Sequence, residues 1–200
     1  VDQGKHRMPA YFFEKPKLEK GQSLYDTKVV QETASRARVV CRKFKEDFEE
    51  ALGSRARSLV VDTGGAAFQL AKYAKFGKLK RVLPRDHDEL YMEFQRLMQL
   101  PMNFDKNVLW IHRLKPEWAD SVSADGTKES VKTNRLERAG YSDMGFEVQA
   151  NVRLGKEVDK KRKVHFKATI LDCRLNQGLD GEELVDEMCT FPFFASLVFG

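Results

Sequence analysis

Apolar residues recur every three or four positions along three stretches of the chain, which is the pattern of amphipathic helices. The first stretch runs from Thr27 to about Leu52, and the others run from Ala66 to Phe76 and from Asp88 to Leu100. Gly53 follows the first stretch at a position where it can end a helix. The sequence therefore predicts three helices.

Two short, unbroken apolar runs lie between and after these helices. They are SLVVD at Ser58–Asp62 and VLWIH at Val108–His112. An unbroken run is typical of a strand that is buried on both faces of a parallel sheet. MPAYFF at Met8–Phe13 is expected to form a further strand. Because strands and helices alternate, we expect an α/β fold with a mainly parallel sheet flanked by helices.

The pattern changes after Pro116. Residues 116–138 are polar and show little apolar periodicity, so we expect a long mobile loop there. FEVQANVRL at 146–154 and KVHFKATILDCRL at 163–175 alternate in polarity, which predicts a C-terminal antiparallel hairpin added to the sheet. A short helix and an apolar end are expected to follow.

Composition narrows the class of protein. With 200 residues and 42% hydrophobic content, we expect a single domain over residues 1–200. No stretch approaches the ~18 consecutive apolar residues of a membrane-spanning helix, and no signal-peptide pattern is visible, so we expect a cytoplasmic protein without membrane contact. Three widely spaced cysteines do not favour a disulfide framework or a zinc site. The net charge of +5 permits contact with nucleic-acid phosphates without requiring it.

Asp62 is the first candidate for chemistry, because ligands bind open α/β sheets at the carboxyl ends of their strands. At such a position a carboxylate can hold Mg²⁺, directly or through water, during phosphoryl transfer. Thr63 and the two glycines after it are compatible with this role. The alternatives are that Asp62 only caps the following helix, or that it is the general base of an unrelated α/β enzyme.

His112 is the second candidate, because it ends the VLWIH run and is expected to emerge at the same edge of the sheet. A neutral imidazole there could bond to a γ-phosphate or orient a water molecule. The alternative is a histidine that is merely hydrogen-bonded at the end of a strand.

Three segments together resemble a known family. They are RSLVVDTGGAAFQLAKYAKFGKLKR, ELYMEFQRLMQL and KNVLWIHRLKPEW, and the likeness covers about Arg57 to Lys115. They resemble the RecA-like P-loop ATPases that phages encode for DNA recombination or single-strand annealing. The resemblance implies a RecA-like fold, ATP and Mg²⁺ as cofactors, single-stranded DNA as a partner and assembly as a homo-oligomer. It makes Asp62 the Walker B carboxylate, with Thr63 beside the nucleotide, and His112 the sensor.

One motif of that family is missing, because GxxxxGK[ST], the phosphate-binding loop, occurs nowhere in the sequence. We expect that an N-terminal strand, this loop and the first helix lie upstream of Val1, and that this chain alone does not hydrolyse ATP. The alternative is a non-catalytic module that keeps the NTPase fold and binds nucleic acid or a protein.

Basic residues in the expected loop are candidates for DNA contact. They are Lys128, Lys132, Arg135 and Arg138. Acidic neighbours dilute this case, so a solvated loop is the alternative. Trp118 in the same loop could stack on a base or anchor the loop. Beyond the loop, Arg174 is a candidate arginine finger toward a nucleotide on a neighbouring subunit, and the alternative is a surface or Asp-paired arginine.

Overall fold

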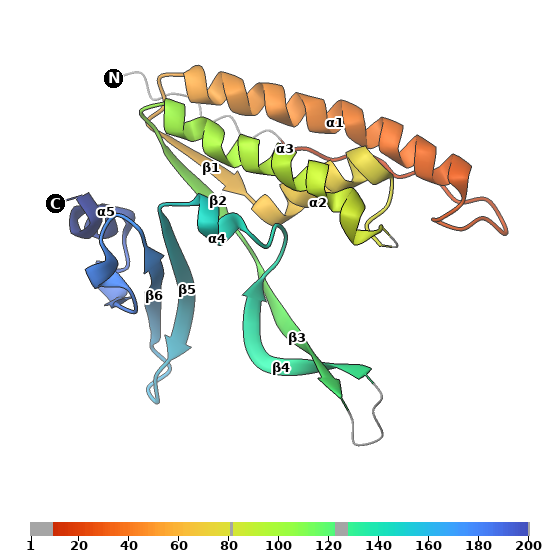
Figure 1. Ribbon diagram of the computed structural model, residues 1–200. Coiled ribbons are helices and arrows are strands. Elements are labelled where there is room, and N and C mark those ends of the chain that lie inside the picture. Colours follow the sequence, from red (N-terminus) through yellow and green to blue (C-terminus); the bar gives the residue numbers. More distant parts are fainter. Residues whose placement is uncertain (1–9, 81, 123–127, 200) are drawn as a thin grey trace. The chain divides into compact units, whose positions relative to one another are not determined.

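The computed structural model describes residues 10–80, 82–122 and 128–199. The chain divides into two compact units, Val1–Ser142 and Asp143–Gly200, which are described separately below (Figure 1). The prediction of a single domain stays a prediction, because two compact units can still unfold as one cooperative domain.

Three long helices of the first unit confirm the predicted helices. They are α1 (Thr27–Gly53), α2 (Gly64–Phe76) and α3 (Asp88–Gln99). Their apolar stripes face one another, and Ala37, Leu52 and Leu90 are almost completely buried in the resulting core. Short 3₁₀ turns precede and follow α3, at Pro84–His87 and Leu100–Asn103.

The two apolar runs form a parallel pair of strands beneath these helices. β1 (Ser58–Asp62) pairs with β2 (Asn107–Ile111) in a register that places Asp62 beside Ile111. Aromatic side chains from two helices pack on β2, since the rings of Phe48 and Phe94 lie 5.6 and 6.1 Å from that of Trp110. The parallel pairing was therefore predicted correctly.

The predicted RecA-like sheet is wrong for the described residues. The parallel sheet has two strands, and the remaining strands form a separate antiparallel pair and a separate three-stranded antiparallel sheet. Burial on both faces was also wrong, because Val60 is 54% exposed and Ile111 is 45% exposed. The physical reason is that a parallel neighbour needs a long crossover, which the chain provides once, between β1 and β2. β4, β6 and β7 each pair antiparallel with the strand that precedes them in the chain, which needs no such crossover.

The segment expected to be the first strand is not a strand in its described part, Ala10–Phe13. Its aromatic rings pack on helices instead. The ring of Tyr11 lies 5.2 Å from Phe44, and the ring of Phe13 lies 5.3 Å from Tyr73. The Tyr11 hydroxyl also donates to Asp47 at 2.9 Å. Burial of these rings against α1 and α2 replaces strand pairing.

The expected mobile loop is largely a two-stranded ribbon. β3 (Leu114–Val122) pairs antiparallel with β4 (Lys128–Arg138), and the register shifts between Pro116 and Trp118 (Figure 1). The sequence did not predict these strands, because both faces of the ribbon are exposed to solvent. Polar residues therefore occupy both sets of alternating positions, and no apolar alternation results.

The second unit is an antiparallel sheet with short helices. A short helix, α4 (Met144–Glu147), precedes β5 (Ala150–Val158), β6 (Val164–Cys173) and β7 (Glu183–Val185). The β5–β6 hairpin confirms that a hairpin forms in this region, although it belongs to its own sheet, in the order β5-β6-β7. The predicted first strand, 146–154, was placed too early, because Phe146 and Glu147 belong to α4 and β5 runs to Val158. Buried side chains on β6 and β7 form the core of this unit, namely Ala168, Ile170, Cys173 and Leu184.

The C-terminal helix, α5 (Phe191–Phe199), follows two 3₁₀ turns at Gln177–Leu179 and Asp186–Met188. It is apolar but only nine residues long. Among the helices in the described ranges, none is both long and apolar enough to cross a bilayer.

Candidate functional site

The first unit brings Asp62 and His112 to one end of the parallel pair. Asp62 is the last residue of β1 and lies in register with Ile111, and His112 follows Ile111 directly. Both residues therefore lie at the carboxyl edge, as the sequence predicted. Asp62 is exposed and His112 is partly buried.

Thr63, and not Asp62, caps the helix that begins at this edge. The Thr63 hydroxyl oxygen accepts a hydrogen bond from the Ala66 amide at 3.1 Å, and the Thr63 carbonyl accepts from the Ala66 and Ala67 amides. The Asp62 carboxylate is thus not used for capping. It projects into solvent beside the positive end of the α2 dipole.

His112 connects the edge to the base of the ribbon. Its Nδ1 lies 3.0 Å from the Ala139 carbonyl oxygen, which can only accept, so Nδ1 carries the proton. Desolvation lowers the pKa of His112, an effect that the hydrogen bond to Ala139 partly offsets and the charge of Arg138 reinforces. The imidazole is therefore neutral at pH 7. Nε2 is buried and has no hydrogen-bond partner among the described residues.

Two glycines make this packing possible. A Cβ on Gly64 would overlap the Nε2 and Cε1 atoms of His112, and a Cβ on Gly65 would lie 3.0 Å from the Ala139 carbonyl oxygen. Gly140, at a φ of +114°, approaches Gly65 so closely that its own Cβ would lie 2.8 Å from the Gly65 Cα. The first turn of α2, His112 and the ribbon base therefore form one tightly packed junction. The Gly-Gly pair was the sequence signal for it, but its packing partner was not predictable.

The carboxyl edge fits a magnesium ion that is bound mainly by water and by a ligand. No group of three or more His, Cys, Asp or Glu side chains suited to a metal occurs in the described ranges. Mg²⁺ needs only one or two carboxylates when waters and phosphate oxygens fill its other positions. Asp62 can supply one such oxygen. His112 cannot do so in this conformation, because Nδ1 is bonded and Nε2 is covered by Gly64.

The ribbon presents an aromatic and basic face. Trp118 is 61% exposed and lies directly across from Lys132 in the antiparallel register. Opposite residues project to the same side of a sheet, so the indole and the ammonium group share one face. Arg135 is exposed on the same strand, Arg138 is half-buried at the ribbon base, and Lys128 begins β4.

Acidic residues of the ribbon are engaged across the strands. Glu117 accepts from the Thr133 hydroxyl at 2.8 Å, and Asp120 accepts from the Ser130 hydroxyl at 3.1 Å. Glu137 forms an ion pair with Lys115 at 3.0 Å. Because the Thr133 and Ser130 hydroxyls are neutral, Glu117 and Asp120 keep their negative charges and still reduce the positive charge of the ribbon.

Arg174 lies in the second unit, directly after β6, with an exposed side chain. Its backbone amide donates to the Gln149 carbonyl at 2.9 Å, which fixes the backbone at this point. Its action on the nucleotide of a neighbouring subunit stays a prediction.

In the second unit, His165 lies between Asp159 and Asp186, an arrangement that the sequence did not predict and that we call the histidine clasp. His165 Nδ1 lies 2.7 Å from an Asp186 oxygen, and Nε2 lies 3.6 Å from an Asp159 oxygen. The hydrogen bond to Asp186 is the main cause that raises the pKa of His165. The same bond lowers the pKa of Asp186, and the Lys163 amide is the main cause that lowers the pKa of Asp159. The clasp joins the β5–β6 turn to the end of β7.

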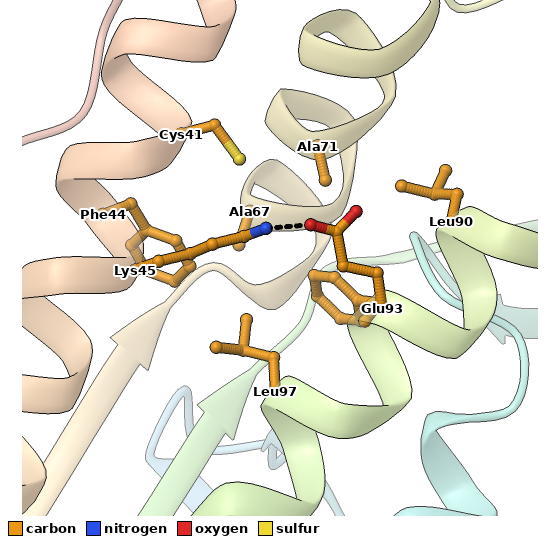
Figure 2. A pocket seen from close by; sticks show the side chains of 9 residues that line it. Cys41, Phe44, Lys45, Ala67, Ala71, Leu90, Glu93 and Leu97 are labelled. Atoms are coloured by element: carbon orange, nitrogen blue, oxygen red, sulfur yellow. Dashed lines mark hydrogen bonds and ion pairs between the residues drawn. The ribbon is translucent and has the colours of Figure 1, made fainter.

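A hollow between the three long helices is a packing seam (Figure 2). Lys45 of α1 reaches across it to an ion pair with Glu93 of α3, and Ala67 and Leu97 line the same hollow. Burial raises the pKa of the Cys41 thiol in its wall, so that thiol is a weak nucleophile. The hollow therefore offers no reactive group.

Comparisons with known proteins add no family to this description. No family model matches the chain, and neither curated proteins nor solved structures gave a match.

Replacing Gly64 with alanine tests the packed junction. We expect Gly64→Ala to lower the free energy of unfolding by about 1–3 kcal/mol, because the added Cβ displaces the His112 ring. Gly53→Ala is the control, since a Cβ there meets nothing within 4 Å. Urea unfolding measures both. In the double variant with His112→Ala the cost of the added methyl should shrink, and strictly additive costs would contradict the proposed contact.

The histidine clasp predicts a dependence of stability on pH. Because the pKa of His165 is raised above 6.5, its contribution is fully present below that value and is lost as pH rises through the folded-state pKa. It also fades as pH falls through the lowered pKa values of Asp159 and Asp186. Wild type should therefore exceed His165→Gln in melting temperature most at about pH 5. Lys160→Gln is the control, and a pH-independent difference for His165→Gln would contradict the clasp.

Proposed function

We propose that this chain binds Mg²⁺–ATP at the carboxyl edge of β1 and β2 and acts on single-stranded DNA in recombination or strand annealing, as phage proteins of this kind do. The chain would work as part of a homo-oligomer. The observation that carries the proposal is the position of the exposed Asp62 carboxylate, which ends a strand of a parallel pair and is not used as a helix cap.

The edge has the features that a metal-bound phosphate needs. Asp62 supplies an oxygen for Mg²⁺ or for one of its waters, and α2 directs its positive N-terminal end to the same place. The proposal requires a phosphate-binding loop, which these 200 residues do not contain. That loop must come from outside this sequence, and hydrolysis should depend on it.

His112 supports coupling between the edge and the ribbon. A phosphate that recruits the imidazole has to break the hydrogen bond between Nδ1 and Ala139, or move the ring away from Gly64. Either change acts on the residues that hold the base of β4. A ligand that displaced the imidazole would therefore also act on the ribbon, so the proposal predicts a DNA contact that responds to nucleotide.

Asp62→Ala in the complete gene product tests the nucleotide site. We expect DNA-stimulated ATP hydrolysis to fall at least about 100-fold, because Mg²⁺ loses its protein oxygen. Asp105→Ala is the matched control, because Asp105 is an exposed carboxylate just before β2, at the opposite end of that strand. Equal hydrolysis by wild type and Asp62→Ala would end the role given to Asp62.

A second candidate function is favoured by the ribbon itself. In this alternative the chain binds nucleic acid through the face of Trp118 and Lys132 and hydrolyses nothing. A two-stranded ribbon that carries an exposed indole and cations suits single-stranded DNA, since the ring stacks on a base while the cations neutralise phosphates. The covered Nε2 of His112 and the missing phosphate loop favour this alternative.

Ribbon variants separate the two candidates when DNA affinity is measured with and without Mg²⁺–ATP. We expect the double variant Lys132→Ala/Arg135→Ala to lower the salt dependence of binding by about 0.7 per lost phosphate contact, and Trp118→Ala to weaken binding about 5- to 100-fold. Lys17→Ala, at an exposed site on the same unit, is the control. If the affinity for DNA is the same with and without Mg²⁺–ATP, the non-catalytic module is favoured. If every ribbon variant binds DNA as tightly as wild type, the ribbon does not contact DNA, and its role in both candidate functions is contradicted.

A further inference from the structure

β5 is an edge strand that combines two different faces. Side chains alternate along a strand, so Arg153, Gly155 and Glu157 share one face, which is polar. The opposite face carries exposed apolar side chains of β5 and β6. They are Val152, Leu154 and Val158 on β5, with Lys156 between the last two, and Val164 and Phe166 on β6, and Leu154 is 73% exposed. Contiguous exposed apolar groups of this kind mark an interaction surface.

Among the described residues of the second unit, the outer edge of β5 has no strand partner, because the sheet order is β5-β6-β7 (Figure 1). The bond from the Asp159 amide to the Lys163 carbonyl sets which residues point toward β6. Along an antiparallel strand, successive residues direct their backbone amide and carbonyl alternately toward one neighbour and away from it. The odd-numbered residues of β5, like Asp159, therefore bond to β6. The amides and carbonyls of Val152, Leu154, Lys156 and Val158 therefore face the open edge, which lacks proline.

The edge is complementary to itself in one antiparallel register. If Gly155 lies opposite Gly155 of a second copy, Arg153 of each copy lies opposite Glu157 of the other. On the apolar face the same register places Val152 opposite Val158. These are favourable cross-strand pairs, and each occurs twice by symmetry.

Hydrogen bonding is compatible with this register and excludes a slip by one residue, and the charges disfavour a slip by two. Leu154 and Lys156 have outward-facing amides and carbonyls, and the register places them opposite each other, so the two copies can exchange backbone bonds. A slip by one residue in either strand mismatches the bonding phase and the faces. A slip by two sets Lys156 opposite Lys156 or moves Arg153 away from Glu157.

We propose that β5 is the interface with a second copy of this chain. The two edges pair antiparallel around Gly155 and join the two three-stranded sheets into one six-stranded sheet. The glycines leave room for close approach at the two-fold axis, since a Cβ on Gly155 meets nothing within 4 Å. On this face, Leu154 of each copy lies opposite Lys156 of the other beside the axis, and the Val152–Val158 pairs flank them. This interface is independent of nucleotide and of the ribbon.

Charge reversal tests the register in the full chain by sedimentation velocity over a range of concentrations. We expect wild type to dimerise reversibly. Arg153→Glu and Glu157→Arg should each raise the dimer dissociation constant about tenfold or more, because like charges then lie opposite each other twice. Lys161→Glu is the matched control, because it changes the charge equally on the turn of the same hairpin. It should leave the dissociation constant unchanged.

Mixing provides the decisive measurement. Arg153→Glu and Glu157→Arg, each weak alone, should form a tight heterodimer, because their pairing again sets opposite charges across from each other. The double variant in one chain should regain self-association. These gains also show that the variants fold. A monomeric wild type at every concentration, no recovery on mixing, or equal weakening by Lys161→Glu would each overturn the proposal.

Discussion

The close approach of two backbone segments at the carboxyl end of the parallel pair is the constraint on which the first unit depends. Gly64 and Gly65 open α2 against His112, and Gly140 brings the end of the ribbon onto the same spot. A side chain larger than hydrogen at Gly64 has no room. Because closely packed interiors transmit such strain, a displacement at the carboxyl edge of the parallel pair also acts on the base of the ribbon.

This junction changes the role that we assign to His112. From the sequence it was a possible contact to phosphate, whereas in the fold its Nδ1 holds Ala139 and its Nε2 is covered. The neutral imidazole therefore acts as a link between two elements in the conformation described. Asp62, by contrast, is accessible. Thr63 caps the N-terminus of α2, so the Asp62 carboxylate is not needed there and stays exposed. The two candidates at one edge have different physical roles.

The second unit depends on a different kind of interaction. Its sheet is small, and β6 in the centre carries the buried residues Ile170 and Cys173. The clasp of His165 and the edge of β5 lie at its periphery, where solvent and partners have access. An open edge beside exposed apolar side chains is a surface on which a further strand can pair.

The sequence by itself determined the local elements. Helical periodicity located α1, α2 and α3, because each of these helices buries one face. The unbroken runs located β1 and β2, although they overstated the burial of these strands, and alternation located the β5–β6 hairpin. It also placed Asp62 and His112 at a common edge. The sequence did not predict how many strands the parallel sheet has. It also did not predict the ribbon, because both faces of the ribbon are exposed to solvent and its sequence shows no apolar periodicity.

Tertiary structure alone decided how far the sheet extends and which groups meet. Tyr11 and Phe13 bury their rings on helices, so their segment does not extend the sheet. Asp186 reaches His165 over 21 residues, and Ala139 reaches His112 over 27. Contacts between residues so distant in the chain depend on the path of the backbone between them, which local side-chain patterns do not encode.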